Sequence, residues 1–208
     1  NSPHRFGGWP CDLEAKLAWS WEPPEGKYSN TGVQSPVVDG DRNLYVSIED
    51  SIRKFSHDGR VLWTFKLPPP WQGSTGPWLR RMPSLAGGLV VTSMTSGFVI
   101  AVSMDTGELV WNVSVTEHRC IGNDFGFIVA GEGLVLGDAE CSDPQSHRHN
   151  KVFALNATDG SHVWDFRPDP GVWNFLPHFV GDGTVTFQTW DGGVYRLRLQ
   201  DGSGLWDA

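Results

Sequence analysis

The sequence is poor in cysteine, methionine and charged residues. Its 208 residues include only 3 Cys and 3 Met, and 19% of them are charged. The cysteines are never spaced as Cys-x-x-Cys, which excludes the usual zinc and thioredoxin-like sites. The 16 Lys and Arg face 24 Asp and Glu, and this net charge of −8 argues against a surface that follows nucleic-acid phosphates. No apolar run approaches the roughly 20 residues that cross a bilayer.

The signals for a cellular compartment are weak. The sequence has no signal-peptide pattern and does not begin with Met, so we expect that a targeting segment has been removed or that the chain is a piece of a longer protein. Cys120 and Cys141 flank one predicted strand pair and are candidates for a disulfide that leaves Cys11 unpaired. Three reduced thiols are an equal alternative. Glycosylation sequons at Asn112 and Asn156 do not decide between compartments.

A short motif recurs along the chain. A glycine is followed four residues later by a tryptophan, and the successive tryptophans are 48, 53 and 42 residues apart. A period of 40 to 50 residues is typical of the blades of a β-propeller. A degenerate fifth copy near the start ends at Trp19. The four clear copies are Gly59/Trp63, Gly107/Trp111, Gly160/Trp164 and Gly202/Trp206.

Each repeat is predicted to form four short antiparallel strands. Runs rich in Val, Leu, Phe and Thr alternate with turns made of Gly with Asp or Thr, which supply the positive φ that tight hairpins need. Helical spacing of apolar residues is absent, so we predict an all-β chain. We expect one extra outer strand at 16–22 and four complete blades at about 35–66, 83–114, 127–167 and 177–207.

Two of the repeats resemble a known motif. Residues 101–111 read Ala-Val-Ser-Met-Asp-Thr-Gly-Glu-Leu-Val-Trp, and residues 154–164 keep the Ala, Gly and Trp. They are similar to the Ala-x-Asp-x-x-Thr-Gly-x-x-x-Trp tryptophan-docking motif of the pyrroloquinoline-quinone (PQQ) repeat propellers, the family of the quinoprotein dehydrogenases. The first and fourth repeats keep mainly the Gly and Trp, with Arg53 and Arg196 where the motif has Ala.

This resemblance implies an incomplete ring and a structural role for the repeated indoles. Such propellers have seven or eight blades, so we expect the chain to be part of a larger ring. A half-ring completed by a partner and a compact five-bladed or open form are the alternatives. A large indole at a fixed offset from a glycine turn can pack on the next blade. We therefore predict structural docking by Trp19, Trp63, Trp111, Trp164 and Trp206.

The long segments between blades are candidates for binding a protein partner. They are stiffened by proline and carry aromatic and Arg side chains, which protein interfaces favour. The alternative is that these aromatic rings fold back over the blades as local apolar lids. The residues concerned are Trp71, Trp78, Arg80, Arg81, Trp173 and Phe175.

No catalytic, cofactor or metal residue is predicted. The segment 138–150 gathers two His, two Asp, one Glu and one Cys, but we interpret it as a solvated surface loop. The quinone enzymes of the family hold PQQ under adjacent cysteines and bind calcium with Glu, Asn and Asp. This sequence has no adjacent cysteine pair, and none of its positions maps onto those ligands.

We therefore expect a non-catalytic propeller scaffold or accessory subunit that binds other proteins. It would resemble the bacterial outer-membrane assembly lipoproteins of this family, with protein subunits of a membrane-associated complex as partners. An extracytoplasmic or organelle-lumen location is favoured by the same analogy. Two alternatives stay open: a fragment of a dehydrogenase that requires PQQ and calcium, or the lumenal ligand-sensing domain of a receptor.

Overall fold

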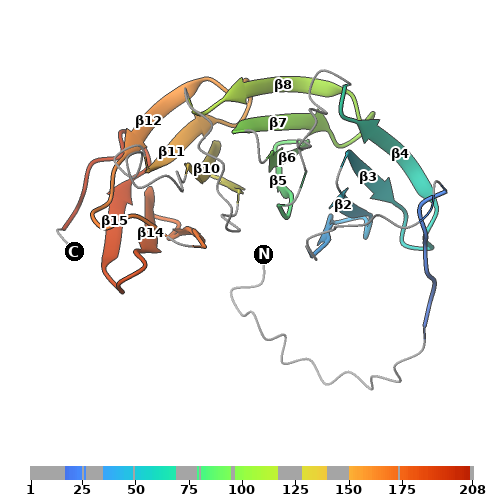
Figure 1. Ribbon diagram of the computed structural model, residues 1–208, viewed down its shortest axis with the longest axis horizontal. Coiled ribbons are helices and arrows are strands. Elements are labelled where there is room, and N and C mark those ends of the chain that lie inside the picture. Colours follow the sequence, from blue (N-terminus) through green and yellow to red (C-terminus); the bar gives the residue numbers. More distant parts are fainter. Residues whose placement is uncertain are drawn as a thin grey trace.

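The regular secondary structure of the protein is β-strand throughout the described residues. We describe it from a computed structural model, which shows an open arc of sheets (Figure 1). The residues described are 17–24, 26, 35–48, 50–68, 79, 81–94, 97–116, 128–139, 150–172 and 174–206.

Fifteen strands within these ranges form four antiparallel sheets, each built from strands consecutive in sequence. The first blade contains β1 (Val37–Val38), β2 (Leu44–Ile48), β3 (Ser51–Phe55) and β4 (Val61–Lys66). The second contains β5 (Ser84–Ala86), β6 (Leu89–Ser93), β7 (Phe98–Ser103) and β8 (Leu109–Ser114). The third contains β9 (Val129–Gly131), β10 (Leu134–Ala139), β11 (Lys151–Asn156) and β12 (His162–Phe166). The fourth contains β13 (His178–Phe179), β14 (Thr184–Gln188) and β15 (Val194–Arg198). The architecture is therefore the predicted all-β propeller, present here as part of a ring.

The outer strands β4, β8 and β12 lie on the convex side of the arc, and the blades follow one another along it (Figure 1). Each blade thus has an upstream face toward the preceding blade and a downstream face toward the following one. A separate apolar cluster fills each of the three gaps between successive sheets. The core of the molecule is consequently divided among the interfaces between blades, as the stacking of repeats requires.

The hairpin between the third and fourth strands of each blade explains part of the repeated motif. Gly107 and Gly160 both have φ of +73°, a conformation that favours glycine. Before them, Ser103 and Asn156 stand where the family motif has Asp. The Ser103 hydroxyl accepts from the N–H of Asp105, and the Asn156 side-chain oxygen accepts from the N–H of Thr158. Both substitutes therefore keep an acceptor for the turn backbone.

The first blade departs from the expected alignment by one residue. Its turn is shorter, because the N–H of Gly59 donates to the carbonyl of Ser56, three residues back, whereas Gly107 reaches back four residues to Ser103. As a result Lys54, rather than Arg53, pairs with Trp63 across β3 and β4. The expectation that Arg53 replaces the motif alanine is wrong for this reason.

The two ends of the arc are less regular than its middle. In the fourth blade the expected outer strand is reduced to one bridge between Leu197 and Gly204, and the described residues end two positions later, at Trp206. At the other end, residues 17–24 carry no strand assignment. There the ring of Trp19 stacks on Phe55 with centroids 6.0 Å apart. This N-terminal segment is thus held against the first blade by side-chain contacts.

Candidate functional site

The repeated indoles join successive blades through one kind of hydrogen bond. The indole N–H groups of Trp63, Trp111 and Trp164 each donate to a backbone carbonyl in the turn between the third and fourth strands of the next blade. The N-terminal segment makes the same contact with the first blade. The four bonds run from Trp19 to His57 (3.1 Å), Trp63 to Met104 (3.0 Å), Trp111 to Ala157 (3.1 Å) and Trp164 to Leu199 (2.8 Å).

The turn glycine provides the space that the indole occupies. A Cβ atom added to Gly107 would lie 2.7 Å from the ring of Trp63, and one added to Gly160 would lie 2.6 Å from the ring of Trp111. Real Cβ atoms essentially never approach so closely. The glycine is therefore required twice, once by its positive φ and once by the flat ring above it.

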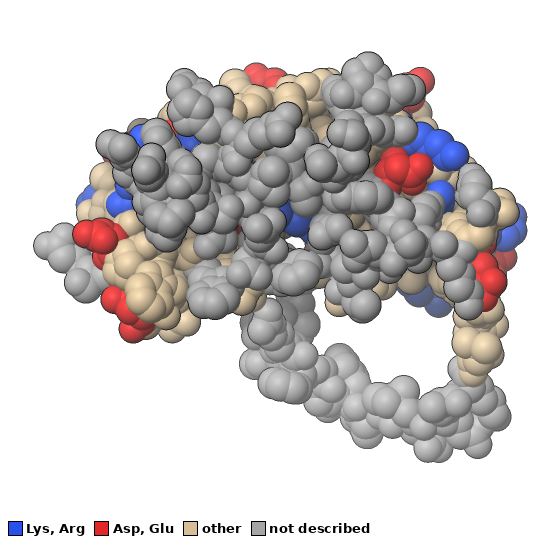
Figure 2. Space-filling view, viewed as in Figure 1, with Lys and Arg blue, Asp and Glu red and all other residues tan. Residues whose placement is uncertain are grey.

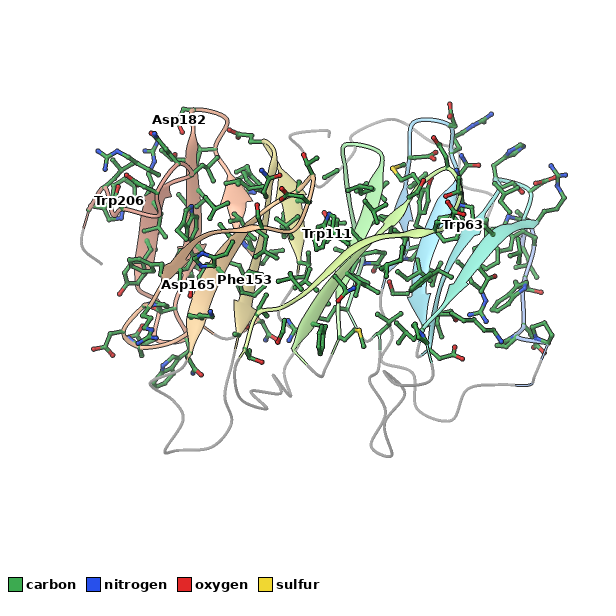
Figure 3. The ribbon with its side chains drawn as sticks, turned by 90° about the horizontal axis from the view of Figure 1, so that it is seen from above. Trp63, Trp111, Phe153, Asp165, Asp182 and Trp206 are labelled. Atoms are coloured by element: carbon green, nitrogen blue, oxygen red, sulfur yellow. The ribbon has the colours of Figure 1, made fainter. Side chains whose placement is uncertain are left out.

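Trp206, the fifth residue of the series, does not make this contact. Its indole N–H donates to the carbonyl of Val194 at 3.0 Å, within its own blade, and the side chain is 45% exposed. The guanidinium of Arg196 lies 5.5 Å from the centre of its ring and pairs with Asp182. Figure 3 shows Trp206 at the end of the arc, whereas Trp111 lies in its middle. The predicted docking role is thus not seen for Trp206, because no following blade lies against it within the described chain.

The downstream face of the fourth blade is open and partly apolar. A hollow of about 670 Å³ lies on it. Trp190 is 63% exposed beside this hollow, and Leu176 and Val194 are also exposed. The residues that line the hollow are Asn174, Leu176, His178, Thr186, Phe187, Gln188, Thr189, Trp190 and Val194.

A buried ion pair connects the segment before the second blade with the third blade. The Nη1 atom of Arg81 lies 3.3 Å from Oδ1 of Asp138, at the end of β10, and both side chains are buried. Burial raises the pKa of Asp138, although the charge and hydrogen bond of Arg81 act in the opposite direction. Removal of the carboxylate from water therefore changes the pKa of Asp138 more than the contact with Arg81 does.

The same place contains two buried oxygens without a hydrogen-bond partner among the described residues. They are Oδ2 of Asp138 and Oγ of Ser93, and both residues line a cavity of about 20 Å³. A cavity of this size is large enough for one water molecule. The ion pair of Arg81 and Asp138, together with Ser93, thus forms a compact polar site inside an otherwise apolar interface.

The predicted binding residues divide into two groups. Arg81 and Phe175 are buried, and their contacts lie inside the fold. Arg81 pairs with Asp138, and the ring of Phe175 packs edge-on against Phe187 with centroids 5.4 Å apart. These two side chains therefore fit the lid alternative. The remaining candidates, Trp71, Trp78, Arg80 and Trp173, lie outside the described residues, as do Cys11, Cys120 and Cys141.

The described ranges carry information on metal binding and on membrane spans. Within them, no three His, Cys, Asp or Glu side chains gather in a way that could hold a metal ion. Most of the segment 138–150 lies outside them. The described residues also form no helix long and apolar enough to cross a membrane.

Charged side chains do not mark a single-sign surface. On the face shown in Figure 2, the described Lys, Arg, Asp and Glu side chains are interspersed along the edge of the arc. They form no continuous patch of one sign there.

Comparison with known proteins identifies the family. The sequence model of the family described as "Outer membrane protein assembly factor BamB" matches residues 14–128, which is more than half of the chain. The chain belongs to this family. A curated BamB from Nitrosomonas eutropha (strain DSM 101675 / C91 / Nm57) is 27% identical over 188 residues, which cover 86% of this chain and 39% of that protein.

Solved structures with a similar fold include BamB and quinone enzymes. BamB from Moraxella catarrhalis has a TM-score of 0.60 at 16% identity and covers 83% of this chain and 47% of its own. A europium-containing methanol dehydrogenase has a TM-score of 0.71 at 13% identity, over 92% and 43% of the two chains. The quinohemoprotein alcohol dehydrogenase from Comamonas testosteroni has a TM-score of 0.66 at 17% identity, and the match covers 84% of this chain and 34% of that one. These structures show the fold, and the chain spans less than half the length of each relative.

Proposed function

We propose that this chain is a non-catalytic propeller scaffold or accessory subunit that binds other proteins within a larger, membrane-associated assembly. The observation that carries the proposal is the 27% identity, over 86% of the chain, to a protein named as an outer membrane protein assembly factor. Similarity over this length at this level supports a related role more strongly than a shared fold does, because one fold hosts many functions.

The structure supports a scaffold rather than a reaction centre. The spaces between the described blades are filled by apolar side chains, and the buried polar pair Arg81–Asp138 connects elements of the fold. We therefore assign the described interior to the stability of the propeller and place partner binding on its loops.

The segments that follow β4 and β12 remain our candidates for the binding surface. Each starts where the outer strand of a blade ends, after Lys66 and after Phe166. They contain Trp71, Trp78, Arg80 and Trp173. Aromatic and Arg side chains on proline-rich segments lose little entropy when a partner binds, which favours such residues as contacts.

An extracytoplasmic location is the second part of the proposal. It is supported by the name of the curated relative, which refers to outer membrane protein assembly. Fractionation of the native host with the protein detected by antibody tests this directly. Recovery in the cytoplasmic fraction would contradict it.

Binding is tested by affinity purification of the tagged protein from solubilised membranes, followed by quantification of co-purified proteins. The double variant Trp71→Ala, Trp78→Ala should lose most of a reproducible partner and keep the thermal unfolding midpoint of the wild type. The matched control is Val110→Ser, which changes an exposed residue of β8 and should keep the partner. Equal recovery with both variants would contradict the proposed surface, and a lowered midpoint in the double variant would favour the lid alternative.

The dehydrogenase alternative has its own readout. The protein is mixed with PQQ and Ca²⁺, and binding and dye-linked alcohol oxidation are measured. Tight PQQ binding together with alcohol oxidation would replace the scaffold proposal, whereas the scaffold proposal predicts neither.

A further inference from the structure

The small cavity between the second and third blades contains two oxygen atoms that need a hydrogen-bond partner. They are Oγ of Ser93, at the end of β6, and Oδ2 of Asp138, near the end of β10. Both atoms are buried, neither is bonded to the other, and neither has a partner among the described residues. Both residues line the cavity of about 20 Å³. Because most buried polar groups in folded proteins are paired, a ligand in this cavity has a clear role.

Three backbone N–H groups beside the cavity already have acceptors. The N–H of Met94 donates to the carbonyl of Phe98 at 2.7 Å, and the N–H of Gly97 donates to the carbonyl of Met94 at 3.0 Å. The N–H of Val115 donates to the carbonyl of Gly97 at 3.0 Å. All four residues line the cavity. These N–H groups are therefore committed to the turn between β6 and β7 and to the segment after β8, and do not serve the two oxygens.

The charges around the cavity favour a neutral ligand. The other carboxylate oxygen, Oδ1 of Asp138, lies 3.3 Å from Nη1 of Arg81. A cation bound at Oδ2 would lie beside this guanidinium, and an anion would lie beside the carboxylate. Either contact between like charges is strongly unfavourable in a buried site. The ligand that fits is thus uncharged.

Size and hydrogen-bonding chemistry then select water. A cavity of this volume holds about one water molecule. The hydroxyl of Ser93 can donate, and the ionised carboxylate of Asp138 only accepts, so the ligand must accept from the first and donate to the second. Water does both, and internal waters make about two to four such bonds. Water also fits the protonated carboxyl group, from which it would accept.

The rest of the cavity wall is largely apolar. It includes Met94 and Phe98 from the second blade and Phe153, labelled in Figure 3, from the third. Apolar cavities of this kind stay dry, because water there would lose its hydrogen bonds. The two oxygens are therefore the feature that would hold a water molecule in this place.

We propose that the cavity binds one water molecule, which accepts from the hydroxyl of Ser93 and donates to Oδ2 of Asp138. The water joins β6 of the second blade to β10 of the third, and it completes the hydrogen bonding of the carboxylate that pairs with Arg81. This link is indirect, unlike the indole–carbonyl bonds between blades. It does not depend on the proposed function.

A high-resolution crystal structure of the wild-type chain tests the site directly. We expect an electron-density peak within about 3.2 Å of both Ser93 Oγ and Asp138 Oδ2. The proposal is overturned if the cavity holds no peak, or if the two side chains turn and bond directly to each other. Crystals grown in rubidium bromide distinguish an ion from water, because Rb⁺ and Br⁻ give an anomalous signal. An anomalous peak in the cavity would also overturn the proposal.

The same site is tested in solution by ¹⁷O magnetic relaxation dispersion, which detects water molecules held inside a protein for longer than it tumbles. Ser93→Val removes the hydroxyl and places methyl groups in the cavity, so the contribution of one long-lived water molecule should be lost. The matched control is Ser84→Val. The hydroxyl of Ser84 accepts directly from the N–H of Ala130 at 2.9 Å, across the same two blades. This variant should keep the dispersion of the wild type.

A dispersion that is the same in Ser93→Val and the wild type would contradict the proposal, and so would equal losses in the two variants. Circular dichroism shows whether each variant keeps the fold. If Ser93→Val unfolds, the crystal structure of the wild-type chain decides the question, because it needs no variant.

Discussion

The interfaces inside the arc and the open face at its end are built from one motif with different results. Trp111 and Trp164 are 7% and 5% exposed, whereas Trp206 is 45% exposed. All three follow a turn glycine by four residues. The difference is the blade that lies against the ring. The motif thus places the indole on the face of its blade, and the ring becomes buried only where the next blade packs against it.

The first interface adds a third case to the comparison. Its indole, Trp63, is only partly buried and is accompanied by Lys54 instead of alanine, yet it makes the same bond to the next turn. The bond to the carbonyl and the contact with the glycine are therefore the common features of the interfaces. The alanine that pairs with the indole, Ala101 or Ala154, occurs only in the second and third of the described blades.

The largest expected effect separates the interior indoles from the terminal one. Trp164→Ala should lower the free energy of unfolding by about 3–5 kcal/mol, because it removes a buried ring and leaves a cavity between blades. Trp206→Ala should lower it by less than about 1 kcal/mol. Urea unfolding followed by circular dichroism measures both. Equal losses would remove the distinction between the interior interface and the open face.

The next effect on the free energy of unfolding is expected at the buried ion pair of Arg81 and Asp138. Arg81→Met should cost about 3–5 kcal/mol near neutral pH, since it leaves the Asp138 carboxylate buried without its cation. The pKa of Asp138 is raised in the folded protein, so its protonated form stabilises the fold below the ordinary carboxyl pKa of about 3.9, and this stabilisation is lost as the pH rises through the raised value. Removal of Arg81 raises that pKa further, so the cost should shrink from about pH 7 to about pH 4.

The control for this pH dependence is Arg81→Met combined with Asp138→Asn. An amide does not titrate in this range, so the further loss that Arg81→Met causes in the Asp138→Asn protein, measured against Asp138→Asn alone, should not depend on pH. A cost of Arg81→Met that is the same at both pH values would show that Asp138 is not the group responsible.

A smaller effect is expected at the turn glycines. Gly133→Ala and Gly160→Ala both place alanine at positive φ, which costs about 1–2 kcal/mol. An added Cβ atom meets nothing within 4 Å at Gly133, but at Gly160 it meets Trp111. Gly160→Ala should therefore cost at least about 1 kcal/mol more than Gly133→Ala in urea unfolding. Equal costs would mean that the indole does not need the space above the glycine.

The smallest effect on the free energy of unfolding is expected for Lys54 at the first interface. Lys54→Met should lower the free energy of unfolding by about 0.5–1.5 kcal/mol, because it removes the bond to the carbonyl of Met104. Arg167→Met, at an exposed position just after β12, is the surface reference and should change it by less than about 0.5 kcal/mol. A loss with Lys54→Met no larger than with Arg167→Met would contradict the role of Lys54 at the first interface.

The sequence was sufficient for the strands and their order because the signals are local. Glycine at a tight turn and a tryptophan four residues later lie within one hairpin, so Gly107 and Trp111 indicate a blade without any knowledge of its neighbours. The position of Lys54 was missed, since the spacing from Gly59 to Trp63 is unchanged while the turn before it is one residue shorter. Only the register of β3 and β4 reveals it.

The fate of the segments between blades was not predictable in the same way. Arg81 and Phe175 lie in stretches rich in proline and aromatic residues, which suit an exposed contact and a local lid equally well. What decides between them is a distant partner: Asp138 for Arg81, and Phe187 for Phe175. The one available signal was the polar Asp138 at the end of an apolar strand, and a single sequence does not indicate which residue pairs with it.

Hydrogen–deuterium exchange of the indole N–H groups, followed by NMR on protein with ¹⁵N-labelled tryptophan, tests the central comparison most directly. Single Trp→Phe variants assign the resonances. Exchange at Trp111 and Trp164 should be slow and approach the rate set by global unfolding, because each N–H is buried in a bond between blades. Exchange at Trp206 should be fast. Protection of Trp206 equal to that of Trp164, or fast exchange at Trp111 and Trp164, would contradict the account.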